Sequence, residues 1–367
     1  MQAGNARATI QEATADYETW LAGYTPLVPL DLAEKHARMA ADRFAFFRAT
    51  YYRWAQQWSE LSADVATAPA VLAVGDLHIE NFGTWRDSEG RLVWGINDFD
   101  EAFTLPYTND LVRLATSALL AIESDHLALR PRPACAALLA GYRAELEAGG
   151  RPFVLTEDHP WLRRVANRRL RDAARFWKRL DLAGAPGADP PPEARMVLDL
   201  ALPERDLPYR AHPRVAGEGS LGHQRWVAIT SWRGARIARE AKARAPSASF
   251  WCARDGAPES GEDPYAAIVA QAVRAHDPFL RIGDRWLVRR LAPDCSRVEL
   301  GSLPDRRDEA ALLGAMGRET ANVHLGTPEM VSVVVADLER RSADWLLQAS
   351  RVMLRRLTRD WKAYRAS

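Results

Sequence analysis

The chain has 367 residues, a length that predicts two domains, or two lobes around a cleft, rather than one small module. Hydrophobic residues make up 47% of it and charged residues 26%, a composition that excludes wholesale disorder. The formal net charge is +1, so no overall field favours nucleic acid or an anionic membrane as a partner.

Targeting and redox signals are weak in this chain. The segment Met1 to Trp20 lacks a basic stretch followed by an apolar core, and the run Leu114 to Ile122 is too short to span a bilayer. The cysteines Cys135, Cys252 and Cys295 are scattered and odd in number, so they predict neither a disulfide framework nor a metal site. We therefore expect a soluble, cytoplasmic protein that contacts neither membrane nor nucleic acid.

The predicted elements change character along the chain. A helix is expected over 31–65, short strands over 71–74 and 91–96, and helices over 109–124, 132–148 and 160–180. Proline and glycine crowd residues 182–193, which predicts a linker. A hairpin of strands 224–231 and 235–243 follows, then a strand over 285–291 and helices over 307–324 and 336–364.

This order predicts an α+β fold in three parts. The first is a helical lobe over residues 1–195 that carries the loops after the first two strands. The second is a small antiparallel-sheet lobe over 196–300, and the third is a set of C-terminal helices over 301–367 that pack on the helical lobe.

Two strand ends deliver carboxylate and amide side chains in close succession. Asp76 and Asn81 share the first loop, Asp98 ends the next strand, and Asp100 follows it. Singly, such residues most often cap turns. As an ordered set they match transfer from ATP, which needs one carboxylate to orient the acceptor and oxygen ligands for Mg²⁺. We predict Asp76 as the catalytic residue and Asn81, Asp98 and Asp100 as ligands of Mg²⁺ or Mn²⁺.

A second interpretation of the same loop is a dinuclear metallophosphoesterase, which begins with a sequence like Val74-Gly-Asp76-Leu-His78. That chemistry needs two metals roughly 4 Å apart and more Asp, Asn and His ligands at later strand ends. The other histidines lack such a context. We therefore interpret His78 as a residue that fixes the loop by hydrogen bonding to nearby backbone.

A glycine-rich turn precedes the predicted hairpin. Gly217, Gly219 and Gly222 have the spacing Gly-x-Gly-x-x-Gly, with Ser220 between them. A strand follows, where a dinucleotide fold would have a helix and a Walker loop would continue with lysine. The turn therefore predicts a phosphate lid at a hairpin tip, as in kinases. A flexible surface hairpin is the alternative.

Lys242 lies in the strand after that hairpin turn. Only four of the 49 basic residues are lysines, so this chain uses arginine by default. A kinase needs a compact cation here to reach the α- and β-phosphates, and the broad guanidinium fork substitutes poorly. Lys242 and the glycine turn are thus the predicted ATP-binding residues, and we expect Lys242 to lie across a cleft from Asp98. A lysine on a surface strand is the alternative.

These motifs together resemble the bacterial domain-of-unknown-function family 2252. The resemblance rests on five segments: Gly75 to Gly83, Asn97 to Glu101, Asp110 to Ser117, the glycine turn, and Lys242 to Ser247. That family is similar to aminoglycoside phosphotransferases and protein kinases, with the catalytic loop preceding the glycine turn. The resemblance implies a two-lobed protein kinase-like fold, circularly permuted, without indicating a substrate.

Three further residue roles are expected. Asp110 braces the catalytic loop by hydrogen bonding, and His324 is a packing residue at the end of its helix. Glu259 and Glu262 are candidates for the glutamate that pairs with Lys242 in kinases.

The function predicted from the sequence is an ATP- and Mg²⁺-dependent phosphotransferase acting on an unidentified hydroxyl of a small molecule or a protein. Three alternatives stay open: a nucleotide-binding pseudoenzyme, a nucleotidyl transferase that moves AMP, and the metallophosphoesterase. The residues alone do not separate attack at the α-phosphate from attack at the γ-phosphate.

Overall fold

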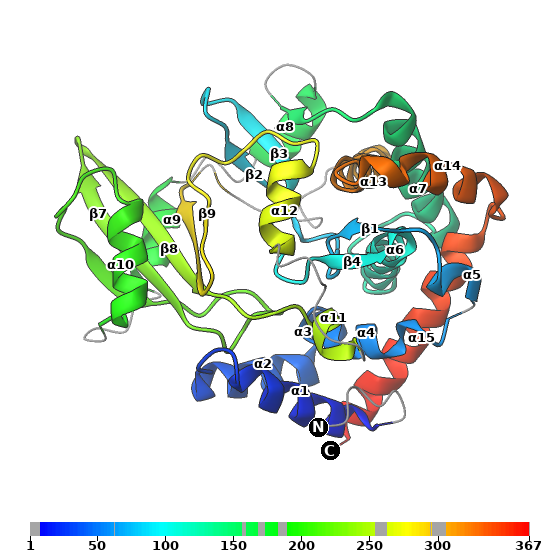
Figure 1. Ribbon diagram of the computed structural model, residues 1–367, viewed down its shortest axis with the longest axis horizontal. Helices are drawn as coiled ribbons and strands as arrows, with labels where there is room; N and C mark the ends of the chain where they lie inside the picture. The colour runs from blue at the N-terminus through cyan, green and yellow to red at the C-terminus, as the bar shows by residue number, and fades with distance from the viewer. Residues whose placement is uncertain are drawn as a thin grey trace.

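The computed structural model describes residues 8–61, 63–155, 159–167, 173–182, 189–253, 263–293, 295 and 306–366. It has a mixed α+β architecture with small antiparallel sheets, as predicted. A five-stranded sheet stands at one side of the molecule and most helices gather at the other (Figure 1). The first and last helices lie side by side, because Gln11 Nε2 donates a hydrogen bond to Ala363 O at 3.0 Å.

The helical part contains the elements expected from the sequence and several that were not. Its helices are α1 (Ile10–Ala22), α2 (Pro29–Ala41), α3 (Arg43–Ala49), α4 (Tyr51–Trp58), α5 (Ala63–Ala66), α6 (Tyr107–Glu123), α7 (Pro131–Ala148), α8 (Pro160–Asn167), α13 (Arg306–His324), α14 (Val331–Arg340) and α15 (Trp345–Arg365). The single helix predicted over 31–65 is therefore wrong. It breaks first at Asp42, whose side chain caps α3 by accepting a hydrogen bond from Ala45 N at 2.6 Å.

The helix α1 was missed although its capping signal is in the sequence. Thr9 and Glu12 form a capping box, in which each side chain accepts a hydrogen bond from the other's backbone N–H. The apolar residues of α1 repeat less regularly at helical spacing than those of the segment 31–65, so the pattern of α1 is the weaker signal.

Two glycines allow α7 and α13 to touch through their backbones. A Cβ atom at Gly141 of α7 would overlap the carbonyl of Gly314, and one at Gly317 of α13 would overlap the carbonyl of Leu138. The helix α13 packs along α7, and α15 packs along α6, whose residues are almost all buried. The helices α13 and α15 thus pack on the helical part.

Two small sheets bring the candidate loops together. The strand β1 (Ala70–Ala73) pairs with β4 (Phe103–Pro106), and β2 (Phe82–Arg86) pairs with β3 (Leu92–Ile96), which also pairs with β5 (Phe153–Val154). The loop from β1 to β2 and the loop from β3 to β4 therefore start and end on the same two sheets. Asn97 N donates to Asn81 O at 3.2 Å, which joins the two loops directly.

The remaining sheet has the strand order β6–β7–β8–β10–β9, with every neighbouring pair antiparallel. Its strands are β6 (Arg210–Pro213), β7 (Arg225–Trp232), β8 (Ala235–Ala243), β9 (Arg281–Ile282) and β10 (Trp286–Leu291). The predicted hairpin of β7 and β8 is confirmed. The short helices α11 (Ala248–Cys252) and α12 (Pro264–Gln271) connect β8 to β9.

Helices cover both faces of this sheet. The helix α10 (Pro192–Ala201) packs on the face that carries Trp226 and Ala241, and α9 (Ala173–Leu182) packs on the opposite face against Val227. The predicted boundary at residue 195 falls inside α10. Residues 183–188 of the expected linker and 168–172 of the helix expected over 160–180 lie outside the described residues.

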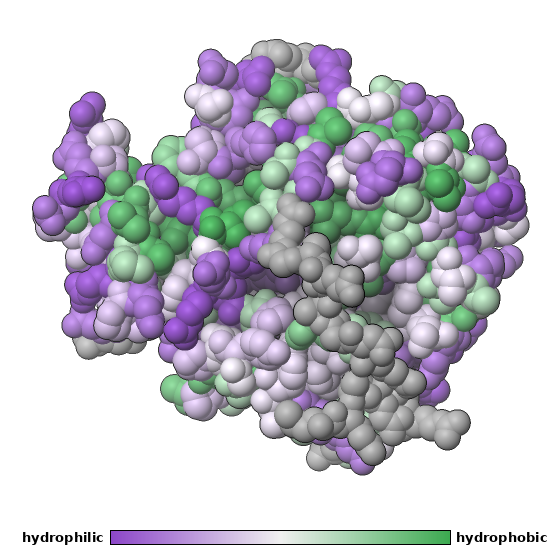
Figure 2. Space-filling view, viewed as in Figure 1, coloured by the Kyte–Doolittle hydropathy of each residue, from purple (hydrophilic) through white to green (hydrophobic). Residues whose placement is uncertain are grey.

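The outer surface of α10 exposes hydrophobic side chains. Hydrophobic side chains gather over α10 in Figure 2, where Met196 and Leu200 are more than half exposed. Among the described helices, none is both long and apolar enough to cross a membrane.

Glu319 of α13 supports the end of β3, just before the candidate metal ligands. Its Oε1 atom accepts a hydrogen bond from Ile96 N at 3.1 Å, and its Oε2 atom accepts one from Asn322 Nδ2 at 3.2 Å. Gly95 leaves room for the carboxyl group, because a Cβ atom there would overlap it. Burial raises the pKa of Glu319 to about 7, partly opposed by Arg274.

Glu319→Gln is expected to change how stability depends on pH. The unfolded chain releases this proton near pH 4.5 and the folded chain near pH 7, so wild-type stability falls as pH rises between these values. The variant has no titrating group at this position, so its free energy of unfolding lacks this decrease. Relative to the wild type, its stability should therefore improve by about 3 kcal/mol between the two pH values. Urea unfolding at pH 5 and pH 8 measures the difference, and parallel wild-type and variant curves would contradict it.

Candidate active site

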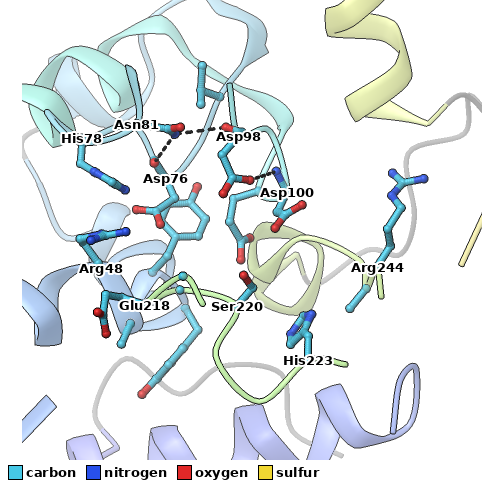
Figure 3. A pocket seen from close by; sticks show the side chains of 18 of the residues that line it. Arg48, Asp76, His78, Asn81, Asp98, Asp100, Glu218, Ser220, His223 and Arg244 are labelled. Carbon is cyan, nitrogen blue, oxygen red and sulfur yellow. Dashed lines mark hydrogen bonds between the residues drawn. The ribbon is translucent and has the colours of Figure 1, made fainter. Parts of the chain in front are cut away.

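A pocket opens where the loops after β1 and β3 meet the glycine turn between β6 and β7. Figure 3 shows Asp76, Asn81 and Asp98 on one side of it and Ser220 on the other. The enclosed part of the pocket is about 60 Å³, and the whole space with its open mouth is about 790 Å³. Of the predicted site residues, Asp76, Asn81, Asp98, Asp100, Gly217, Gly219 and Ser220 line it. Lys242 contacts two of the lining residues, whereas Gly222 lies behind the turn against Leu32.

Asp110 holds the start of the loop after β1 by hydrogen bonding, as expected. Its carboxylate accepts hydrogen bonds from Val74 N at 2.7 Å and from Gly75 N at 2.9 Å. The Nε2 atom of His324 lies 3.0 Å from the same carboxylate, and its Nδ1 atom lies 2.8 Å from the hydroxyl of Tyr142. All of these groups are buried, so His324 is a packing and bracing residue behind the pocket. Gly75 is needed here because its φ is 80°.

Asp76 presents one carboxylate oxygen to the pocket. Arg113 Nε donates to Asp76 Oδ1 at 2.7 Å, while a Cβ atom on Gly219 would come within 3.5 Å of Oδ2. Burial raises the pKa of Asp76, and the Arg113 guanidinium opposes that increase. Arg113 is itself 1% exposed and lies over the ring of Phe47 at 4.0 Å. One oxygen is therefore fixed and the other faces the glycine turn.

The Asn81 amide is oriented by two backbone carbonyls. Its Nδ2 atom donates to Asp76 O at 3.2 Å and to Asp98 O at 3.1 Å. Its Oδ1 atom is buried and accepts no hydrogen bond from any residue that the structure describes. An amide oxygen that is held in place without a donor is suited to a cation, because a buried polar atom left unpaired is costly.

His78 performs the loop-fixing role that the sequence predicted. Its Nδ1 atom accepts a hydrogen bond from Glu80 N at 3.2 Å, and its side chain is buried. The hydrogen bond engages Nδ1, so this nitrogen is not available as a metal ligand.

Lys242 reaches across from β8 to the loop after β3, as expected. Its Nζ atom lies 3.6 Å from Asp98 Oδ1 and forms an ion pair with Asp100 Oδ2. The lysine side chain is 4% exposed, whereas the two carboxylates are a quarter to a third exposed. Asp100 was predicted as a metal ligand, and here it is the main partner of the lysine. Glu259 and Glu262, the other candidate partners, lie outside the described residues.

The glycine turn lies over Asp76 but is anchored on the helical part. Gly222 O accepts a hydrogen bond from Val28 N at 2.8 Å, and Glu218 forms an ion pair with Arg38 at 3.0 Å. Gly217 and Gly222 have φ angles of 81° and 103°, which favour glycine. The turn therefore closes the pocket through contacts with α2, which the sequence did not predict.

Sequence reasoning missed two buried residues of the site: Arg113, which contacts Asp76, and Glu101, which lines the pocket. Arg113 lies three positions after Asp110 on α6, so both side chains face the loop after β1. Residues with this spacing share one side of a helix, and the sequence could therefore have indicated the role of Arg113. Glu101 lines the pocket and accepts hydrogen bonds from Ser247 Oγ and Ala248 N at 2.9 and 2.6 Å. Burial raises the pKa of Glu101 to about 8.

The oxygen atoms near Asn81 are of the type that magnesium binds, but those of the described residues are too few to complete its coordination. Within the described ranges, no group of three or more His, Cys, Asp or Glu side chains is arranged to hold a metal. Asn81 Oδ1 and a carboxylate of Asp98 or Asp100 are the available oxygens, which matches sites where phosphates supply the remaining ligands.

Comparison with known proteins agrees with one part of the sequence resemblance. No curated protein and no solved structure matches the chain. The family described as "Uncharacterized protein conserved in bacteria (DUF2252)" matches residues 27–172. That segment carries Asp76, Asn81 and Asp98 but neither the glycine turn nor Lys242.

Proposed function

We propose that the pocket binds ATP with Mg²⁺ and transfers a phosphorus-containing group to a hydroxyl of an acceptor. The contact of Lys242 with Asp98 and Asp100 carries this proposal. A buried lysine and the predicted metal ligands, far apart in the chain, meet beside a glycine-rich turn. This combination of charges suits a triphosphate with its metal.

The sheet order supports a kinase-like arrangement. The glycine turn joins the first two strands of the five-stranded sheet, and Lys242 lies on the third. Protein kinases also carry their phosphate-binding lysine on the third strand, after a glycine-rich loop. The catalytic loop precedes the sheet in the chain, so the proposed fold is a circularly permuted, two-lobed kinase-like fold with one cleft.

In the proposed mechanism, each side chain has a separate task. Asp76 Oδ2 orients the acceptor hydroxyl and takes its proton, while Arg113 holds Oδ1 and opposes the increase in pKa that burial causes. Lys242 and the glycine turn position the phosphates. Asn81 and Asp98 would hold Mg²⁺, which neutralises phosphate charge when bound. The anchored turn excludes water from Asp76.

Metal dependence tests this proposal. Wild-type protein should bind ATP about tenfold more tightly with Mg²⁺ than with a chelator, and Asp98→Asn should remove that difference. Asp189→Asn is the matched control, because Asp189 is exposed and does not line the pocket. Calorimetric titration measures all three proteins. Equal ATP affinity of the wild type with and without chelator would refute the metal assignment.

A pseudoenzyme would bind ATP in the same way, so a turnover assay must accompany the titration. ATP consumption that depends on Mg²⁺ and is lost in Asp98→Asn supports the transferase. Metal-dependent binding without any consumption supports the pseudoenzyme instead.

A further inference from the structure

The sheet face that carries Lys242 also carries a group of arginines. Side chains two apart on a strand share a face, as do cross-strand partners. Arg225 of β7 is paired with Lys242, and Arg289 of β10 is paired with Glu240 of β8. All four side chains therefore project from the side of the sheet that meets Asp98.

Three guanidinium groups surround one carboxylate on this face. Glu240 is fully buried, and its Oε1 atom accepts hydrogen bonds from Arg225 Nη1 at 3.1 Å and Arg289 Nε at 2.9 Å. Arg214, just after β6, forms an ion pair with Oε2. One carboxylate cannot neutralise three arginines, so this network, the "arginine cluster" of Arg214, Arg225 and Arg289, keeps an excess of positive charge.

The arginine cluster is open to a ligand and connected to the glycine turn. The side chains of Arg214 and Arg289 are each 26% exposed. Arg225 donates from Nη2 to Ser220 Oγ, while its buried Nε has no acceptor among the described residues. Basic groups arranged in this way, with one donor unpaired, suit an anion with several oxygens.

The arginine cluster lies beyond Lys242, outside the residues that line the pocket. The chain after Lys242, at Ala243 to Ala245, lines the pocket, so Glu240 lies further from it along β8. Successive residues on one face of a strand are about 7 Å apart, so Glu240 and its arginines lie about one triphosphate length beyond Lys242. Starting from Asp76, a ligand meets Asp98, then Lys242 and Arg225, and then Arg289 with Arg214.

Building on the proposed function, we infer that the arginine cluster binds the β- and γ-phosphates of ATP, so that the α-phosphorus lies beside Asp76 and the protein transfers AMP. A terminal phosphate carries nearly two negative charges, which the cluster matches. A nucleobase in that place would lie against a buried carboxylate and guanidinium groups, whereas base pockets are mostly apolar.

The transfer step is balanced without another reactant. The acceptor oxygen forms a bond to the α-phosphorus, and the bond from that phosphorus to the oxygen bridging the β-phosphate breaks. Pyrophosphate leaves with the bond's electron pair, and Asp76 Oδ2 receives the hydroxyl proton. Arg289 and Arg214 stabilise the charge that develops on the leaving pyrophosphate.

Product analysis tests the inference directly. Purified protein is incubated with Mg²⁺ and ATP labelled at the α- or the γ-phosphate, and nucleotides and the intact protein mass are analysed. We expect pyrophosphate with AMP, free or attached to the protein, and no product from Asp98→Asn. ADP with inorganic phosphate would overturn the inference and leave the proposed function standing, whereas absence of ATP binding would overturn both.

Comparing ATP and AMP binding across arginine variants tests the position of the phosphates even if the protein shows no turnover. Arg289→Gln and Arg214→Gln should each weaken ATP binding at least about tenfold and AMP binding less than about twofold. Arg285→Gln, an exposed residue of the same lobe that pairs with Glu193, should change neither. Equal losses for AMP and ATP, or no loss, would overturn the inference. Thermal unfolding verifies that each variant is folded.

Discussion

Replacing Lys242 with alanine is expected to lower ATP-dependent turnover by ~10²-fold or more, equivalent to ~3 kcal/mol of transition-state stabilisation. The ammonium group forms ion pairs with Asp98 and Asp100, where the sheet meets the loop after β3. We expect the loss of this charge to leave the phosphates poorly positioned relative to Asp76. The protein should still fold, because both carboxylate partners retain access to water.

Lys242→Arg should also be impaired, because a planar guanidinium cannot take the position of an ammonium that contacts Asp100. Steady-state kinetics measure both variants, with thermal unfolding as the test of folding. Lys362→Ala, at the exposed end of α15, is the matched control. Full turnover in Lys242→Ala would end the assignment of this residue to the phosphates.

The proximity of Asp76, Asn81 and Asp98 was predictable because these residues are close in sequence. Asp76 and Asn81 share one loop, and β2 and β3 form a simple antiparallel pair that returns the chain to Asp98. The contact between Lys242 and Asp98 spans 144 positions, and it was predicted from the chemistry that a triphosphate needs. Spacing within the chain could not have supplied it.

Residues that act through tertiary burial were harder to predict. Arg113 is indistinguishable in sequence from dozens of other arginines, and its role comes from the rings of Phe47 and Trp54 that enclose it. The arginine cluster likewise depends on strand register, which sets Arg289 opposite Glu240. In a sequence with many arginines, a single functional arginine cannot be distinguished by residue type, whereas each of the few lysines can.

Helix breaks and anchoring contacts were also beyond the sequence pattern. The cap at Asp42 interrupts an apolar period that otherwise continues, because a local hydrogen bond competes with helix propagation. The anchoring of the glycine turn depends on Val28 and Arg38, which belong to a helix nearly 200 residues earlier in the chain. Only the folded structure brings these segments together.

Asp76→Asn is expected to reduce turnover by ~10³-fold while leaving ATP affinity nearly unchanged. An amide can still accept the hydrogen bond from Arg113 but cannot take a proton from the acceptor hydroxyl. The loss should therefore appear in kcat and not in the binding of ATP, which depends on Lys242, Asn81 and the glycine turn. A variant that lost both would indicate that Asp76 holds the metal instead.

The pH profile separates this catalytic role from a structural one. Burial raises the pKa of Asp76, and the carboxyl must be ionised to accept a proton, so wild-type turnover should fall as pH decreases through that pKa. In Asp76→Asn the same acid limb should disappear, leaving a low rate that does not respond to this group. Asp64→Asn, an exposed aspartate on α5, should keep the wild-type profile. An acid limb that persists in Asp76→Asn would show that another group accepts the proton.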